Sequence, residues 1–203
     1  MGPTKGGGVR YWGLAYQPSV QLIMRRGKQL ITTAGRRYDM SKPNRVSSLD
    51  MLKFEVVNPL SSGAKACLTE YFKELDERLI DGFDPDEDVL EEYSEYSLPG
   101  GLFLVASESG GWVGCGGLKR LTDESVYIKR MWVDKAWRGI GLGRRLLALL
   151  ESHAKNLGYA VVKLETNRVL HEAIQLYQSQ GYQKTAPFVE EPCADYWFEK
   201  RLE

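Results

Sequence analysis

Three alternating glycines lead into a predicted helix in the stretch WRGIGLGRRLL, residues 137–147. Gly139, Gly141 and Gly143 allow the backbone to approach a ligand closely. The free N–H groups and the positive dipole end of a helix N-terminus attract anions, and Arg138 and Arg144 add positive charge beside them. The pattern therefore predicts a loop that binds a phosphate group. A strand-to-helix turn whose glycines serve only tight packing is the alternative.

Two common phosphate-binding loops do not match this spacing. A nucleotide-hydrolase loop requires Gly-x-x-x-x-Gly-Lys-Ser/Thr, and the stretch has neither that spacing nor a Lys-Ser/Thr pair. A dinucleotide fingerprint requires its third glycine three positions after the second, whereas Gly143 follows Gly141 by two. The motif that remains is Arg-x-x-Gly-x-Gly, residues 138–143.

The segments around the loop predict the elements that must position it. The expected strands are 52–57, 102–107, 112–120, 125–133, 159–166 and 195–202, and the expected helices lie between Ser61 and Gly82 and at 87–96, 142–157 and 170–180. Only the strand–loop–helix–strand segment implies a parallel pair, and such junctions often bind ligands. This order predicts an α+β fold, layered α/β/α, with a mixed, mostly antiparallel sheet of six to seven strands and about four helices.

Charge divides the chain into a basic leader and an acidic body. Residues 1–50 carry nine Lys and Arg against two Asp and Glu, and residues 51–203 carry 18 against 25. The leader is rich in Gly, Arg and Lys without sustained periodicity, so we expect it to be poorly ordered. We expect residues 51–203 to form one domain. Because nucleic-acid binding calls for a basic face, an acidic body argues against it for the main domain.

The composition also bears on membrane association, on the cellular compartment and on metal binding. No window approaches the roughly 18 uninterrupted apolar residues of a membrane span, so no membrane association is expected. Three unpaired cysteines fit a reducing compartment, and we expect a cytoplasmic protein. His153 and His171 lie 18 residues apart without other ligands at metal-binding spacing, so no metal is expected.

Several motifs in order resemble the acyl-CoA-binding core of the GNAT superfamily of N-acetyltransferases. They are VYIKRMWVDKAWRGIGLGRRLLALLESHAKNLGY (126–159), VVKLETN (161–167) and EAIQLYQSQGY (172–182), within a resemblance that spans residues 52–203. The segments PGGLFLVA, IKRMWV and WFEKRL further resemble the acetyltransferase half of proteins that join a MarR-type DNA-binding domain to a GNAT domain. The leader is too short to be such a DNA-binding domain. The resemblance implies the GNAT fold and acetyl-CoA as co-substrate.

The resemblance assigns three groups of residues to acetyl-CoA. The pyrophosphate would lie on the loop formed by Arg138, Gly139, Ile140, Gly141, Leu142, Gly143 and Arg144. The backbone of Met131, Trp132 and Val133 would pair with the pantetheine arm and polarise the thioester carbonyl. Asn167 matches a polar position that contacts the pantetheine, and a turn or helix N-cap is its alternative role.

The resemblance also assigns the general acid but leaves the base open. Tyr177 matches the tyrosine that protonates the departing CoA thiolate, which a phenol with a pKa of about 10 can do. Many relatives carry a basic carboxylate on the strand at 126–133, but here that strand contains no acid. Glu124 and Glu165 are the nearest candidates, and a water chain is equally open.

The implied reaction is direct attack of a primary amine on acetyl-CoA in a ternary complex. A small-molecule amine is the expected acceptor because the chain is compact. The eight carboxylates of residues 81–95 could attract such an amine by charge. A protein or peptide acceptor is one alternative, and a non-catalytic module that senses acyl-CoA is another. A homodimer also stays open.

Overall fold

The computed structural model describes residues 22–26, 29–32, 37–39, 49–83 and 93–203. The chain divides into two compact units, Met1–Asn44 and Arg45–Glu203. In the first unit, β1 (Leu22–Arg26), β2 (Gln29–Thr32) and β3 (Arg37–Asp39) form an antiparallel sheet. The boundary near residue 50 and the poorly ordered leader stay predictions, because most leader residues lie outside the described part.

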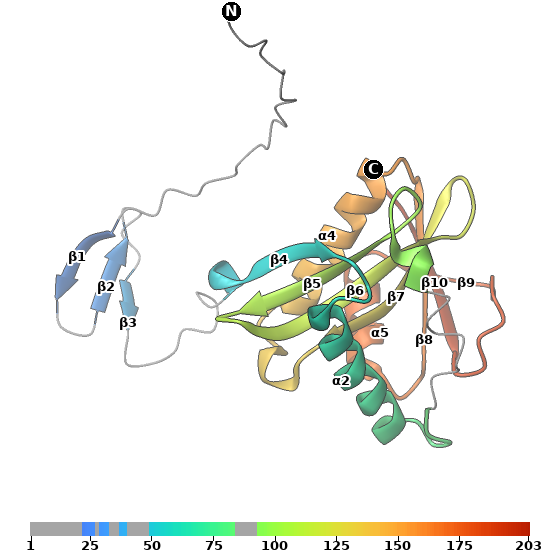
Figure 1. The fold of residues 1–203 in the computed structure, drawn as a ribbon, viewed down its shortest axis with the longest axis horizontal. Helices are drawn as coiled ribbons and strands as arrows, with labels where there is room; N and C mark the ends of the chain where they lie inside the picture. The colour runs from blue at the N-terminus through green and yellow to red at the C-terminus, as the bar shows by residue number, and fades with distance from the viewer. Residues whose placement is uncertain (1–21, 27–28, 33–36, 40–48, 84–92) are drawn as a thin grey trace, which may run out of the picture. The chain divides into compact units, whose positions relative to one another are not determined.

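The second unit is built on one seven-stranded mixed sheet with the order β4-β5-β6-β7-β8-β10-β9 (Figure 1). Its strands are β4 (Lys53–Val57), β5 (Leu102–Glu108), β6 (Gly111–Arg120), β7 (Ser125–Val133), β8 (Val161–Thr166), β9 (Gln183–Thr185) and β10 (Tyr196–Arg201). Only β7 and β8 pair in parallel. The predicted α+β fold with a mixed, mostly antiparallel sheet is confirmed.

Three α-helices and three short 3-10 helices accompany the sheet in the described residues. They are α2 (Ser62–Arg78), α4 (Leu142–Asn156), α5 (His171–Ser179), η1 (Leu49–Met51), η2 (Tyr93–Tyr96) and η3 (Lys135–Trp137). The helix predicted at 87–96 corresponds to η2 only over its last residues, since 84–92 lie outside the described residues. The acidic segment 81–95 is outside them for the same reason over most of its length.

The two faces of the sheet carry separate cores because successive strand residues point to opposite faces. Along β5, Leu104 and Ala106 belong to the core that includes α4, whereas Phe103 and Val105 belong to the core that includes α2. Helix α2 begins where the Ser61 hydroxyl accepts a hydrogen bond from the Ala64 amide, 3.3 Å away. The sheet therefore lies between α2 and α4 (Figure 1).

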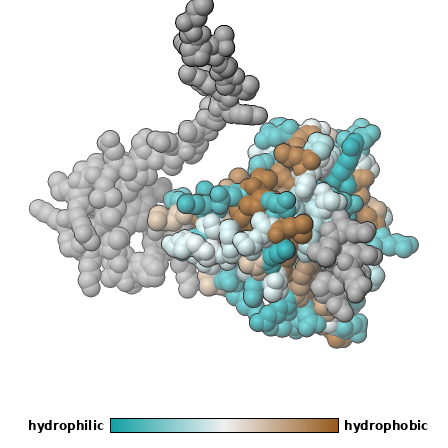
Figure 2. All heavy atoms as spheres, in the orientation of Figure 1, coloured by the Kyte–Doolittle hydropathy of each residue, from teal (hydrophilic) through white to brown (hydrophobic). Residues whose placement is uncertain are grey.

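The outer surface of this unit mixes polar and apolar side chains. Figure 2 shows hydrophilic residues interleaved with smaller hydrophobic areas on the face in view. Among the described residues, no helix is both long enough and apolar enough to span a bilayer.

Strands β7 and β8 separate after a short paired region. The parallel pairing runs only from Ser125 opposite Val161 to Tyr127 opposite Lys163. Beyond it, β7 continues along β6 and β8 continues along β10. The second half of β7 therefore has an unpaired edge that faces the gap between the two strands.

A β-bulge lies at the point where β7 leaves β8. Cys115 pairs with Trp132 and Gly117 pairs with Lys129, so two β7 residues stand opposite one residue of β6. Arg130 in this bulge has a left-handed φ of 58°. The Cys115 thiol donates to the Arg130 carbonyl, 3.3 Å away, and holds this strained residue in place.

Candidate active site

The glycine loop adopts a backbone that side chains disfavour. Gly139 has φ 74° and Gly141 has φ 101°, both in the left-handed region. Gly141 is the N-cap residue of α4, and no side chain caps this helix. The first amides of α4 are thus left available, as an anion site at a helix N-terminus requires.

A cavity of about 550 Å³ lies in front of this loop, and we call it the loop cleft. Its floor is the end of β7, and α2 and α5 supply further walls. The predicted residues that line it are Met131, Trp132, Val133, Arg138, Gly139, Gly141, Gly143 and Arg144. Ile140 and Leu142 do not line it, and Leu142 is fully buried, so only backbone atoms of these two could serve a ligand.

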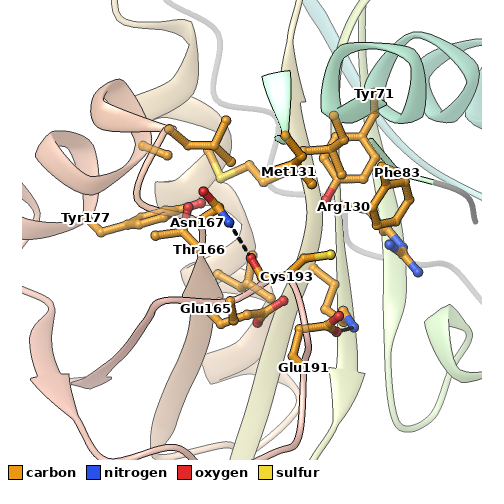
Figure 3. Close-up of a pocket in the computed structure, with 17 residues that line it drawn as sticks. Tyr71, Phe83, Arg130, Met131, Glu165, Thr166, Asn167, Tyr177, Glu191 and Cys193 are labelled. Carbon is orange, nitrogen blue, oxygen red and sulfur yellow. Dashed lines mark hydrogen bonds and ion pairs between the residues drawn. The ribbon is translucent and has the colours of Figure 1, made fainter. Parts of the chain in front are cut away.

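A second cavity of about 100 Å³ adjoins the loop cleft, and we call it the inner pocket (Figure 3). Figure 3 shows Tyr177 and Glu165 on one side and Tyr71 and Phe83 on the other. The residues that line both cavities form the neck between them, and they are Tyr71, Leu75, Met131, Leu170, Ala173 and Tyr177. Because these residues line both cavities, the loop cleft and the inner pocket adjoin at the neck.

The structure places Tyr177 in the neck, as a general acid between the two cavities would require. Its side chain is only 6% exposed and packs against Tyr182 and Phe198, with ring centroids 5.9 and 6.1 Å away. Burial raises the pKa of Tyr177 above its ordinary value. The hydroxyl therefore keeps its proton at neutral pH.

Glu165 contributes a carboxylate to the inner pocket from β8. Its Oε2 atom is buried, and the nearby Tyr127 hydroxyl stabilises the ionised carboxylate. Burial raises the pKa of Glu165, while the charge of Lys129 acts in the opposite direction. Lys129 also forms an ion pair with Glu191, with 2.9 Å between Nζ and Oε2. A carboxylate with a raised pKa is a suitable general base near neutral pH.

Glu124, the other candidate base, lies away from both cavities. Its side chain is exposed, and its carbonyl accepts hydrogen bonds from the amides of Ala160 and Val161 at the paired end of β7 and β8. The residues that line the loop cleft and the inner pocket do not include it. The structure therefore brings Glu165, and not Glu124, to the inner pocket.

Asn167 lines the inner pocket with its amide engaged in the turn before α5. Its Nδ2 donates to the Cys193 carbonyl at 2.7 Å (Figure 3), and its Oδ1 accepts from the Val169 amide at 3.0 Å. These two hydrogen bonds give Asn167 the turn role that was expected as the alternative to a contact with pantetheine. A contact with pantetheine stays a prediction.

The backbone at the end of β7 faces the loop cleft at alternate residues. Trp132 pairs with Cys115, and the Asp134 amide donates to Val113 of β6, 3.0 Å away. Because polar groups alternate along a strand, those of Met131 and Val133 point to the unpaired edge. The Val133 carbonyl there accepts a hydrogen bond from Arg138 Nε at 2.8 Å.

Arg138 is held within the protein, whereas Arg144 is exposed at the cleft. Arg138 contacts the Val133 carbonyl and forms ion pairs with Glu74 and Glu172. Arg144 lines the loop cleft, and its side chain is exposed. Of the two arginines, Arg144 is better placed to meet an incoming anion with its side chain, and Arg138 fixes the loop against β7.

The sequence did not predict the two glutamates that pair with Arg138, Glu74 and Glu172, or Arg78, which pairs with both glutamates. Glu74 of α2 accepts hydrogen bonds from Trp132 Nε1 at 3.1 Å and from Arg78 at 3.0 Å, besides that from Arg138. Burial acts to raise the pKa of Glu74, but the hydrogen bonds from Arg138 and Arg78 outweigh it and keep the pKa below its ordinary value. The only local signal was the i,i+4 spacing of Glu74 and Arg78.

No metal site is formed by the residues that the structure describes. They contain no group of three or more His, Cys, Asp or Glu side chains placed to hold an ion.

Comparisons with known proteins agree with this architecture. An IAA acetyltransferase from Azospirillum brasilense is 35% identical over 123 residues, which make up 60% of this chain and 80% of that relative. The crystal structure of a GNAT-family acetyltransferase from Staphylococcus aureus Mu50 matches with a TM-score of 0.62 and 21% identity, over 74% of this chain and 100% of the other. A GNAT-family acetyltransferase from Elizabethkingia anophelis with acetyl-CoA bound matches with a TM-score of 0.57 and 20% identity, over 75% and 99%.

The family itself follows from the sequence match. The model of the acetyltransferase (GNAT) family matches residues 68–182, a range that contains the glycine loop, the splayed β7 and β8, and Tyr177. The two solved structures share the fold at low identity and so confirm the predicted GNAT fold. The chain belongs to the acetyltransferase (GNAT) family and is an acyltransferase.

Proposed function

We propose that this protein transfers an acetyl group from acetyl-CoA to the primary amine of a small molecule, by direct attack in a ternary complex. The observation that carries the proposal is the meeting of the loop cleft and the inner pocket at Tyr177. Such a neck lets a donor in one cavity meet an acceptor in the other. Holding the donor and the acceptor in the right orientation supplies a large part of the rate enhancement of acetyl transfer over the reaction in solution.

The residues of the loop cleft fit acetyl-CoA, which a structural neighbour binds. The amides at the start of α4 and the Arg144 side chain suit the pyrophosphate, and the left-handed glycines leave room for it. The unpaired edge at Met131 and Val133 suits the amide groups of the pantetheine arm. Acetyl-CoA supplies the activated thioester.

Three groups of the chain then carry the chemistry. Glu165 takes a proton from the acceptor ammonium, because its carboxylate lines the inner pocket. The free backbone amides of β7 stabilise the negative charge that develops on the thioester oxygen. Tyr177 gives its proton to the departing thiolate sulfur.

The size of the inner pocket favours a slender amine as acceptor. Its volume is about 100 Å³, less than the roughly 150 Å³ of an apolar cavity that holds one benzene molecule. Its walls combine apolar and aromatic side chains with the charged Lys129, Arg130, Glu165 and Glu191. An amine on a short arm fits this space, while the remainder of the acceptor stays outside the pocket.

The experiment that tests the proposal measures CoA thiol release from acetyl-CoA against a panel of primary amines, with the mass of each product. We expect at least one amine to gain an acetyl group, and we expect Glu165→Gln to lower its turnover about 10²-fold. Glu124→Gln is the matched control and should leave turnover unchanged. Acetyl-CoA binding without amine-dependent release in any arm would support an acyl-CoA sensor instead, and acetylation confined to added peptides would support a peptide acceptor.

A further inference from the structure

Four charged residues form an ion cluster that joins α2, the glycine loop and α5. They are Glu74 and Arg78 of α2, Arg138 of the loop and Glu172 of α5, and all four line the loop cleft. Arg78 donates more side-chain hydrogen bonds than Arg138, the other arginine of the cluster. Arg78 Nη1 donates to Glu74 Oε1 at 3.0 Å and also to Glu172, and its Nη2 donates to Glu172 Oε2 at 3.0 Å.

Arg78 lies next to the neck and bridges its two helical walls. It follows Leu75 by one helical turn on α2, and Leu75 lines the neck. On the other side, Glu172 precedes Ala173 of the neck, and Arg78 Nη2 also donates to the Val169 carbonyl at 2.8 Å. One guanidinium therefore fastens the end of α2 to the start of α5, 94 residues away.

The contacts of Arg78 are stronger than those of a typical surface ion pair. Glu172 accepts two hydrogen bonds from one guanidinium, and such bidentate pairs are both stronger and more specific in geometry. The Arg78 side chain is 25% exposed, the Glu74 side chain 10% and the Glu172 side chain 52%. The hydrogen bond from Arg78 lowers the pKa of Glu172 to about 2, so Glu172 is ionised at neutral pH.

The reaction at the neck needs protection from water. Water can attack the thioester carbon as an amine can: a C–O bond forms, the C–S bond breaks, and acetate and CoA thiol are released. The side chains of the neck are mostly apolar, and the ion cluster bridges α2 and α5 beside it. Exclusion of water from such a site limits this side reaction.

We propose that Arg78 and Glu172 form a clasp that holds α2 against α5 beside the neck and keeps bulk water from the bound thioester. The inference rests on the proposed use of acetyl-CoA. Arg78 and Glu172 are positioning residues in this account, because they act by holding the two helical walls.

The test measures acetate and CoA thiol release from saturating acetyl-CoA alone, for the full chain without any amine. We expect Arg78→Met and Glu172→Gln each to raise acetate release about tenfold, while the Kd for acetyl-CoA changes less than about threefold. Because both substitutions open the same clasp, the double variant should release acetate no faster than the faster single variant. Arg78→Lys keeps the charge and should restore part of the protection.

The matched control is Arg168→Met. Arg168 lies on the turn before α5 and forms an ion pair with Asp195 at 2.8 Å. It lines neither cavity. Its acetate release should equal that of the wild type. The clasp is contradicted if both clasp variants lose thermal stability or acetyl-CoA affinity while acetate release stays at the wild-type rate. Failure of the wild type to bind acetyl-CoA would overturn the proposed function itself, so the two failures are distinguishable.

Discussion

At the scale of single residues, the proton of Tyr177 is the group on which the proposed chemistry depends most. Burial raises its pKa and keeps it protonated. We predict that Tyr177→Phe lowers kcat about 10²-fold and changes the KM for acetyl-CoA less than about threefold, because the ring remains and only the proton donor is lost. Steady-state kinetics check this. Tyr182→Phe, whose ring packs 5.9 Å from that of Tyr177 outside both cavities, should keep full turnover.

The proposed general base Glu165 predicts a pH dependence with a defined sign. A general base must be ionised, so kcat/KM should rise with pH through a pKa that burial places above the ordinary Glu value of about 4.3. Glu165→Gln should remove this limb from the pH profile of kcat/KM. An identical limb in the variant would assign it to the acceptor amine and exclude Glu165 as the base.

Stability provides a separate check on the same carboxyl group. Because its pKa is raised in the folded state, ionisation of Glu165 costs folding free energy, and this cost is fully present above the folded-state pKa. Glu165→Gln should therefore not lower the Tm at pH 8. Thermal unfolding followed by circular dichroism measures this, and a clear fall in Tm would indicate a structural role.

At the scale of elements, the glycine loop couples backbone conformation to ligand binding. Gly139 has φ 74° and lines the loop cleft, while Gly110 in the β5–β6 turn has φ 86°, and a Cβ at either position meets no atom within 4 Å. We predict that Gly139→Ala and Gly110→Ala each cost about 1–2 kcal/mol of folding free energy, from the left-handed backbone alone. Only Gly139→Ala should weaken acetyl-CoA binding, as calorimetry can show. Equal acetyl-CoA affinities of Gly139→Ala and the wild type would mean that the glycine loop does not hold acetyl-CoA.

The sequence predicted the bounds of helices and strands better than it predicted how the strands pair. The glycine loop, α4, α5 and the strands around them follow from local patterns, such as alternating glycines and apolar spacing, and the structure has them within a few residues of the expected bounds. The separation of β7 from β8 depends on pairings with β6 and β10, which local patterns do not encode. The bulge at Arg130 likewise arises from its register against β6.

The site shows the same division between local and long-range information. Tyr177 and the loop residues were predicted from motifs, and the structure brings them to one pair of connected cavities. The contact between Arg78 and Glu172 joins residues 94 positions apart and left no signal in the sequence. The choice between Glu124 and Glu165 also required the fold, because both are near the strands in sequence but only Glu165 lines the inner pocket.

At the scale of the whole molecule, the proposed activity belongs to the second compact unit alone. Within the part of the chain that the structure describes, every residue that lines the loop cleft or the inner pocket lies between Tyr71 and Ala194, within Arg45–Glu203. We predict that a chain of residues 45–203 keeps the kcat and acetyl-CoA affinity of the full chain within about twofold, as expected for a unit with its own core. Kinetics and thermal unfolding of the two chains check this. A loss of activity with retained folding would show that the first unit contributes to the site.

The central claim is that the thioester lies in the neck beside Tyr177. A crystal structure of the protein with acetyl-CoA tests it most directly. The account predicts the pyrophosphate on the amides at the start of α4 and the thioester sulfur within about 3.5 Å of the Tyr177 hydroxyl. A pyrophosphate bound away from the glycine loop, or a thioester that does not enter the neck, would contradict it.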